Sequence, residues 1–242
     1  MAATDPLCKL EGQITGLVRR RQNRDFVLGV MGGDVDASAV AASLAGMGGA
    51  AMAIASLDSR ETADFVEFSL DGVPVRGWFW RFPFAEGERI ELVAERDAHG
   101  WMALGARRKH DGLVAVYPHC FEGRRAHYVS TFRFWGLVVA VIFLFMMALD
   151  AVFALFRGTF SVADQGAAYA VYGAYGLPAL VAVFGFLAWR AGRKTEGLAR
   201  TAERIFAGFG WEDPAGINLR KTSRALRREG DGRDYGLRVF RY

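Results

Sequence analysis

Two long runs of apolar residues dominate the second half of the chain. Residues 134–156 contain a single acid, Asp150, and residues 167–189 contain no ionised side chain. A helix rises about 1.5 Å per residue, so each run is long enough to cross a hydrocarbon layer of roughly 30 Å. The pattern therefore predicts a hairpin of two transmembrane helices. The alternative, a buried hairpin inside a globular core, would need more surrounding amphipathic structure than this chain provides.

The first half shows short runs in which apolar and polar residues alternate. Residues 66–70 alternate, Asp71 and Gly72 supply a two-residue turn, and residues 73–80 return as a second strand. Residues 90–95 and 101–107 continue the pattern, and residues 12–19 and 26–30 add two earlier strands. Five strands are enough to close a small barrel, so these segments predict a β-barrel of the OB-like or SH3-like type over residues 10–117. Its expected core includes Val66, Phe68, Val75, Ile90 and Leu92.

Residues 37–57 are rich in Ala, Gly and Met and carry no charge. We expect a helix here, inserted between the early strands and the strand hairpin. Small side chains allow close approach of helices, so this segment is either a connecting helix packed on the barrel or a further membrane-associating segment.

The residues after the second apolar run are basic. Residues 190–242 hold 13 Lys and Arg against 7 Asp and Glu, a net charge of +6. Residues 195–209 have apolar positions at helical spacing and predict a juxtamembrane amphipathic helix that stops at Gly210. A helix over residues 217–228 would place Lys221, Arg224 and Arg228 on one face. This face would either bind anionic lipid or be solvated and serve only to fix the membrane topology. We do not expect it to bind nucleic acid.

These segments predict an α+β membrane protein with three parts. Residues 1–131 form a cytoplasmic β-rich domain, residues 132–190 form the transmembrane hairpin, and residues 191–242 form a basic cytoplasmic tail. Basic residues resist translocation, and they flank the hairpin on both outer sides while residues 157–166 between the runs hold one Arg and one Asp. Both termini are therefore expected in the cytoplasm. The side chains expected at the lipid headgroups are Arg125, Arg133, Arg190, Arg193 and Lys194.

Familiar catalytic motifs are missing from the sequence: it has no glycine-rich phosphate loop, no zinc-protease helix motif and no nucleophile elbow. The densest polar group is the segment 117–127, directly before the first apolar run. Its His119, Cys120 and His127 could be soft metal ligands, but their spacing is irregular and a fourth ligand is lacking, so we expect no metal and no cofactor. Adjacent side chains on an extended chain point apart, which argues against His119 and Cys120 as a base and nucleophile. We interpret this segment as a rigid connector without catalytic residues.

Asp150 is the one acid inside an apolar run. An ionisable group in a span is costly and usually faces a partner or water, so Asp150 is a candidate functional residue; if the span ends early, it is a loop residue.

An ordered set of short motifs resembles a family of bacterial membrane proteins described as type VI secretion system effectors. The set comprises Gly12-x-Ile14, Asp25-Phe26, the residues 44–51, the residues 64–68, Gly77-Trp78, Pro83-Phe84-x-Glu86-Gly87, and Tyr-Pro-His-Cys-x-x-Gly-Arg-x-Ala-His at 117–127. The last motif is the most specific.

This resemblance implies a bacterial inner-membrane protein that takes part in contact-dependent competition between bacteria. Such a protein would be an effector that inserts its hairpin into a bilayer, or a resident immunity or binding module that neutralises a cognate toxin through its cytoplasmic domain. Either role implies contacts with lipid and with a protein partner and leaves a homo-oligomer open. The expected partner contacts are Tyr117, His119, Cys120, Arg124 and His127.

Overall fold

A computed structural model describes residues 7–24, 61–97 and 100–242, so the expected strand at 26–30 and the helix at 37–57 lie outside the described residues. The chain divides into two compact units. The barrel unit combines the described residues up to Ala126 with residues 197–242, and the helical unit comprises residues 127–196.

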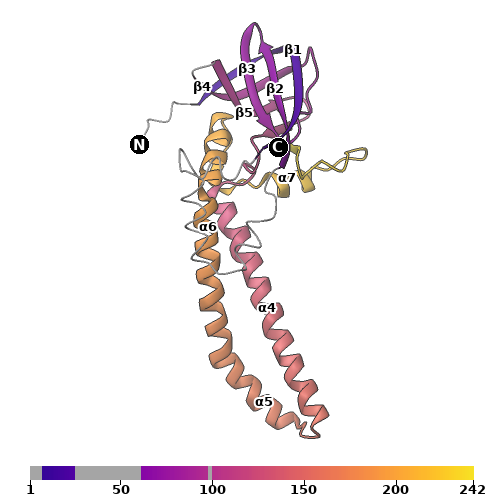
Figure 1. Cartoon of the computed structure of the whole chain (residues 1–242), viewed down its shortest axis with the longest axis vertical. Coiled ribbons are helices and arrows are strands. Elements are labelled where there is room, and N and C mark those ends of the chain that lie inside the picture. The colour runs from indigo at the N-terminus through magenta and orange to yellow at the C-terminus, as the bar shows by residue number, and fades with distance from the viewer. Residues whose placement is uncertain (1–6, 25–60, 98–99) are drawn as a thin grey trace. The chain divides into compact units, whose positions relative to one another are not determined.

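A closed five-stranded barrel forms the centre of the barrel unit, which confirms the prediction of a small β-barrel. Its strands are β1 (Cys8–Arg24), β2 (Glu61–Leu70), β3 (Val73–Phe79), β4 (Arg89–Asp97) and β5 (Gly100–Arg108) (Figure 1). The long β1 pairs antiparallel with β4 through its first half and with β2 through its second half. A parallel pairing of β3 with β5 closes the barrel.

The barrel interior contains the core residues that the alternation pattern predicts. Val66, Phe68, Val75, Ile90 and Leu92 are all buried there. At the predicted turn, Leu70 pairs with Val73, and Asp71 and Gly72 have φ values of 48° and 86°. Two successive positive φ angles are what a tight hairpin turn of this length needs, and an Asp-Gly pair tolerates them.

Residues 197–242 fold onto the barrel and not as the separate tail that the charge pattern indicated. They comprise the end of α6 (Leu177–Gly208), a 3-10 helix η2 (Pro214–Gly216), α7 (Leu219–Ala225) and β7 (Phe240–Arg241), which extends the barrel sheet through β6 (Leu113–Val116). The basic helix is shorter than predicted: α7 holds Lys221 and Arg224, whereas Arg228 lies beyond its end.

The predicted amphipathic helix at 195–209 is present, but it is continuous with α6 and its apolar face is covered by protein. Leu198, Ala202, Ile205 and Phe209 are buried in a second core together with side chains of β4, β5 and β6. The contact is close, since a Cβ atom at Gly105 would lie 2.7 Å from Cγ2 of Ile205.

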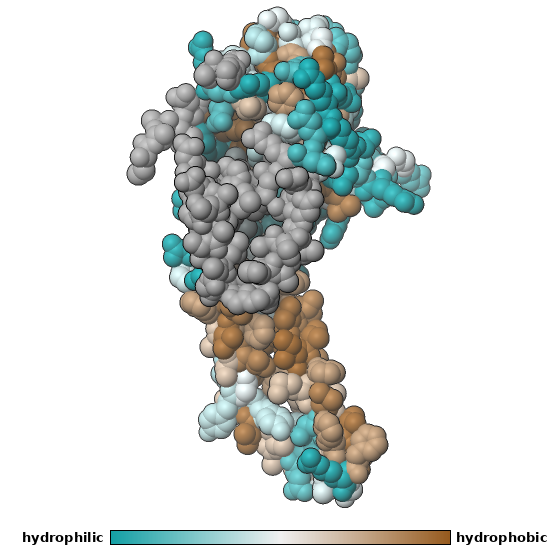
Figure 2. Space-filling view, viewed as in Figure 1, coloured by the Kyte–Doolittle hydropathy of each residue, from teal (hydrophilic) through white to brown (hydrophobic). Residues whose placement is uncertain are grey.

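The helical unit contains the two predicted apolar helices. The first is α4 (Arg124–Phe156), and the second runs from α5 (Val162–Val171) through a short π-helix, η1 (Tyr172–Gly176), into α6. Both are long and apolar enough to cross a membrane, and within residues 127–190 their apolar side chains are exposed or half-buried, apart from the buried Val139 and Ala188. Figure 2 shows this apolar surface as a brown band along the helices.

Candidate functional site

The segment that carries the family resemblance begins with a tight turn. The amide of Tyr117 donates to the carbonyl of Leu104 at 2.7 Å, and the amide of Cys120 donates to the carbonyl of Tyr117 at 3.0 Å. Pro118 occupies the second position of this turn, and His119 occupies the third with φ 66°. Proline followed by a positive φ is the pattern of a type II turn. The turn directs Cys120 into the second core, where it is fully buried.

Residues 121–123 pair with residues 217–219, at the start of α7. The amide of Leu219 donates to the carbonyl of Phe121, and the amide of Gly123 donates to the carbonyl of Ile217, both at 2.9 Å. The Asn218 side chain donates to Oε1 of Glu122 at 2.7 Å. These bonds connect the segment to the C-terminal part of the barrel unit.

Two aromatic rings of this region stack beside a guanidinium group. Trp80 and Phe121 have ring centroids 5.8 Å apart, and Cζ of Arg220 lies 3.9 Å from the Phe121 centroid. His119 meets Trp80 edge-on at 4.9 Å. The motif residues before α4 therefore serve as packing and turn elements of the barrel unit.

Both arginines at the start of α4 are in ion pairs. Nε of Arg124 lies 2.8 Å from Oε2 of Glu203, and Arg125 pairs with Asp213. The expectation had placed Arg125 at lipid headgroups and Arg124 at a protein partner. Each has an acidic partner within the barrel unit, and the two contacts expected from the sequence stay predictions.

His127 belongs to the helical unit, whereas His119 and Cys120 belong to the barrel unit. Nε2 of His127 lies 3.0 Å from the hydroxyl of Thr195, and the Tyr128 hydroxyl donates to Glu196 at 3.1 Å. Throughout the described part of the chain, no three His, Cys, Asp or Glu side chains come together as metal ligands would. Burial raises the pKa of the Cys120 thiol, so this group stays protonated at neutral pH and is a poor nucleophile or ligand.

The remaining basic residues of the headgroup prediction lie on the two long helices. Arg133 and Arg190 are exposed, and Cζ of Arg193 lies 5.1 Å from the ring centroid of Trp189. The side chain of Lys194 lies outside the described part of the structure.

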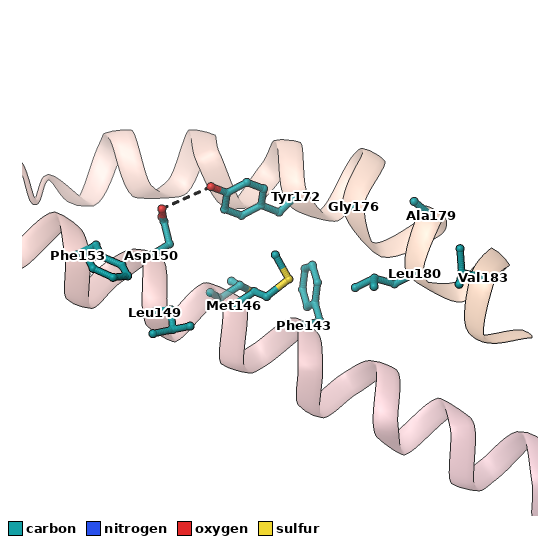
Figure 3. Close-up of a pocket in the computed structure, with 11 residues that line it drawn as sticks. Phe143, Met146, Leu149, Asp150, Phe153, Tyr172, Gly176, Ala179, Leu180 and Val183 are labelled. Carbon is teal, nitrogen blue, oxygen red and sulfur yellow. Dashed lines mark hydrogen bonds between the residues drawn. The ribbon is translucent and has the colours of Figure 1, made fainter. Parts of the chain in front are cut away.

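Asp150 lines a cavity of about 590 Å³ between the two helices of the hairpin (Figure 3). The Tyr172 hydroxyl donates to Oδ1 of Asp150 at 3.4 Å, and the Tyr169 hydroxyl donates to the carbonyl of Met147 at 3.1 Å. The other lining side chains are apolar: Phe143, Met146, Met147, Leu149, Phe153, Ala179, Leu180 and Val183, with Gly176 beside them. The arrangement can hold an apolar molecule and present one carboxylate and one hydroxyl to it.

Sequence reasoning singled out Asp150 but missed Tyr172 and the π-helix that begins there. A π-helix adds one residue to a helical turn, and such insertions are frequent at functional sites. The available signal was the cluster of tyrosines and glycines at 169–176, in a run whose other residues are mostly Ala, Val and Leu.

Comparisons with protein-family models, with curated proteins and with solved structures give no match for this chain.

Proposed function

We propose that this chain is a non-enzymatic bacterial inner-membrane protein of the type VI secretion effector and immunity repertoire, which acts by membrane insertion and protein contacts. The observation that carries the membrane part is the exposed apolar surface of α4 and of the α5–α6 helix. A surface this large and this apolar is typical of contact with lipid. The secretion part rests on the motif resemblance alone.

The composition of the barrel unit supports a topology in which both ends of the hairpin lie on one side of the membrane. This unit is built from chain before the hairpin and from residues 197–242 after it. A single folded unit cannot lie on both sides of a bilayer, so the two flanks must share a compartment. The basic flanks favour the cytoplasm.

We infer that the five-stranded barrel is of the OB type. The support is the strand connectivity, in which β1 pairs with both β2 and β4 while β3 pairs with β5. OB-type barrels are five-stranded Greek-key structures that bind ligands on one face and its loops. In this protein we assign that role to a protein partner.

The first candidate role is an effector whose hairpin disrupts a bilayer. The second is a resident immunity or binding module, and the discontinuous barrel unit favours it. The barrel unit is complete only when both flanks of the hairpin are on the same side, as they are when a hairpin inserts during synthesis of the chain.

Cysteine accessibility tests the topology. In a variant in which Cys8 and Cys120 are replaced, single cysteines are introduced as Thr159→Cys, Ala163→Cys or Glu229→Cys, all at exposed positions. A membrane-impermeant maleimide should label the first two in intact spheroplasts and the third only after permeabilisation. The reverse pattern would overturn the proposed orientation.

Expression of the chain without its gene neighbours distinguishes the two roles. An effector should depolarise the cells, and Leu144→Lys in the middle of α4 should relieve this effect because it places a charge in the span. A resident module should be harmless and should protect against a neighbouring toxin. Hydrolysis of lipid, nucleotide or peptidoglycan by the purified protein, lost when His119, Cys120 and His127 are all replaced by Ala, would overturn the non-enzymatic proposal.

A further inference from the structure

We propose that the Asp150 cavity is a binding site for a lipophilic organic cation, an ammonium group carried on one apolar chain. The cavity lies wholly within the helical unit, between α4 and the α5–α6 helix. Its volume of about 590 Å³ is in the range of small-molecule sites.

Charge selects the class of ligand. Asp150 is the one ionisable acid among the described lining residues, and none of these residues is Lys, Arg or His. The Tyr172 hydroxyl reaches Asp150 at 3.4 Å, which leaves most of the hydrogen-bonding capacity of the carboxylate for another group. A carboxylate next to an apolar cavity is stabilised by a cation that enters with its own apolar chain, because the ion pair offsets the cost of leaving water.

The distribution of side chains fits an amphiphile. Figure 3 shows Asp150 and Tyr172 facing each other across one end of the cavity, with Phe143, Leu180 and Val183 toward the other end. Asp150 precedes the last residue of α4, Phe156, by six positions, or about 9 Å along the helix axis. The polar end thus lies near the loop between the helices, and the apolar end lies deeper along the hairpin.

Tyr172 offers a second contact for a cation. An ammonium group at Asp150 would lie beside the Tyr172 ring, and aromatic faces attract such groups. A zwitterionic lipid fits less well, since its phosphate would need a basic partner and the described lining supplies none. A neutral amphiphile would fill the apolar part but would leave the carboxylate without a counter-charge.

Calorimetric titration of the full chain in phosphatidylcholine nanodiscs tests the inference. The probe is dodecyltrimethylammonium, the matched neutral probe is dodecyldimethylamine oxide at pH 8, and empty nanodiscs give the bilayer background. We expect saturable binding of the cation at one site per chain. Asp150→Asn should weaken it about ten-fold or more, the loss expected when a charge-assisted contact is removed.

Two control variants separate the site from general effects. Asp164→Asn removes an acid from the first turn of α5 that does not line the cavity, and it should leave cation binding unchanged. Tyr172→Phe keeps the ring and frees the carboxylate, so binding should be retained. Equal binding of the cation to wild type and Asp150→Asn, or equal binding of both probes to wild type, would overturn the inference.

This inference rests on the proposed membrane insertion of the hairpin, and the assay distinguishes the two. A chain that fails to enter nanodiscs contradicts the insertion. A chain that enters them and does not bind the cation contradicts only the site.

Discussion

The Glu203 carboxylate binds both the backbone and the side chain of Arg124. Oε1 accepts from the Arg124 amide and Oε2 accepts from its Nε, each at 2.8 Å. Arg124 is the first residue of α4, where backbone amides have no partner within the helix. Glu203 from α6 therefore acts as a cap for α4, although it lies 79 positions away in the sequence.

We expect Glu203→Ala to cost about 1–2 kcal/mol of stability, because it removes both the cap of α4 and an ion pair. Arg124→Ala should cost less, since the backbone amide keeps its bond to Glu203. Thermal unfolding of the detergent-solubilised protein, followed by near-ultraviolet circular dichroism, measures both. Glu229→Gln at an exposed position is the control. Equal losses for Glu203→Ala and Arg124→Ala would show that the ion pair, and not the cap, carries the effect.

Gly123 occupies a place without room for a side chain. A Cβ atom there would meet the carbonyl oxygen of Pro214 and would lie 2.7 Å from that of Ala215. Gly123→Ala should therefore destabilise the barrel unit by about 1–3 kcal/mol, the usual cost of overpacking. Gly136→Ala on α4 has open space around the added methyl and should leave the melting temperature unchanged or slightly raised. Similar melting temperatures for the two variants would contradict the steric account.

The strand hairpin could be predicted because its signals are local. Alternation over residues 66–70 and an Asp-Gly turn specify both faces and the register without any distant contact. The extent of β1 could not be predicted in this way. Residues Arg19–Asn23 are exposed and pair with β2 as a polar ribbon, so they show no alternation.

The packing of residues 197–242 onto the barrel could not be predicted, because it depends on contacts between segments that are distant in the sequence. On β4, the alternation predicts that Glu91 faces solvent, yet Glu91 is 1% exposed and the neighbouring Val93 is fully buried. Val93 lies in the second core with Ile205 of α6 and with Phe209 just beyond its end, more than one hundred positions later. Basic composition identified the charge of this region and gave no information about that packing.

Of the two polar residues in the candidate site, the sequence predicted one. Asp150 stood out because an acid is rare in an apolar run. Tyr172 did not, since its importance comes from its place opposite Asp150 on the facing helix, which no local pattern specifies.

The two cysteines should differ sharply in reactivity. Burial raises the pKa of the Cys120 thiol, whereas Cys8 is half-buried on β1. In the folded protein at pH 7.5, we expect a maleimide to modify Cys8 and to leave Cys120 unmodified. Denaturation should expose both, and mass spectrometry of peptides gives the extent at each position. Modification of Cys120 at the rate of Cys8 in folded protein would contradict its place in the second core.

Glu91 should make the stability of the barrel unit depend on pH in the acid range. Its carboxylate lies 2.7 Å from Nζ of Lys9 and 2.9 Å from Nζ of Lys109. Burial alone would raise the pKa of Glu91, but the two lysine ammonium groups outweigh it and hold the pKa below its ordinary value of 4.5. A lowered pKa in the folded state means that the stabilisation is fully present above the ordinary value and is lost as the pH falls through the folded one.

We therefore expect Glu91→Gln to destabilise the protein by about 1–3 kcal/mol at pH 7, since it leaves Lys9 without its buried counter-charge and Lys109 with only the more exposed Glu11. The difference from wild type should shrink as the pH is lowered through 4.5 and beyond, because the wild-type carboxylate then loses its own charge. Urea unfolding at a series of pH values measures this difference. Glu67→Gln removes an exposed acid 3.5 Å from Arg20, and as the matched control it should change stability by less than about 1 kcal/mol at every pH. A Glu91→Gln difference that stayed constant from pH 7 to pH 3 would show that the glutamate acts through packing and not through its charge.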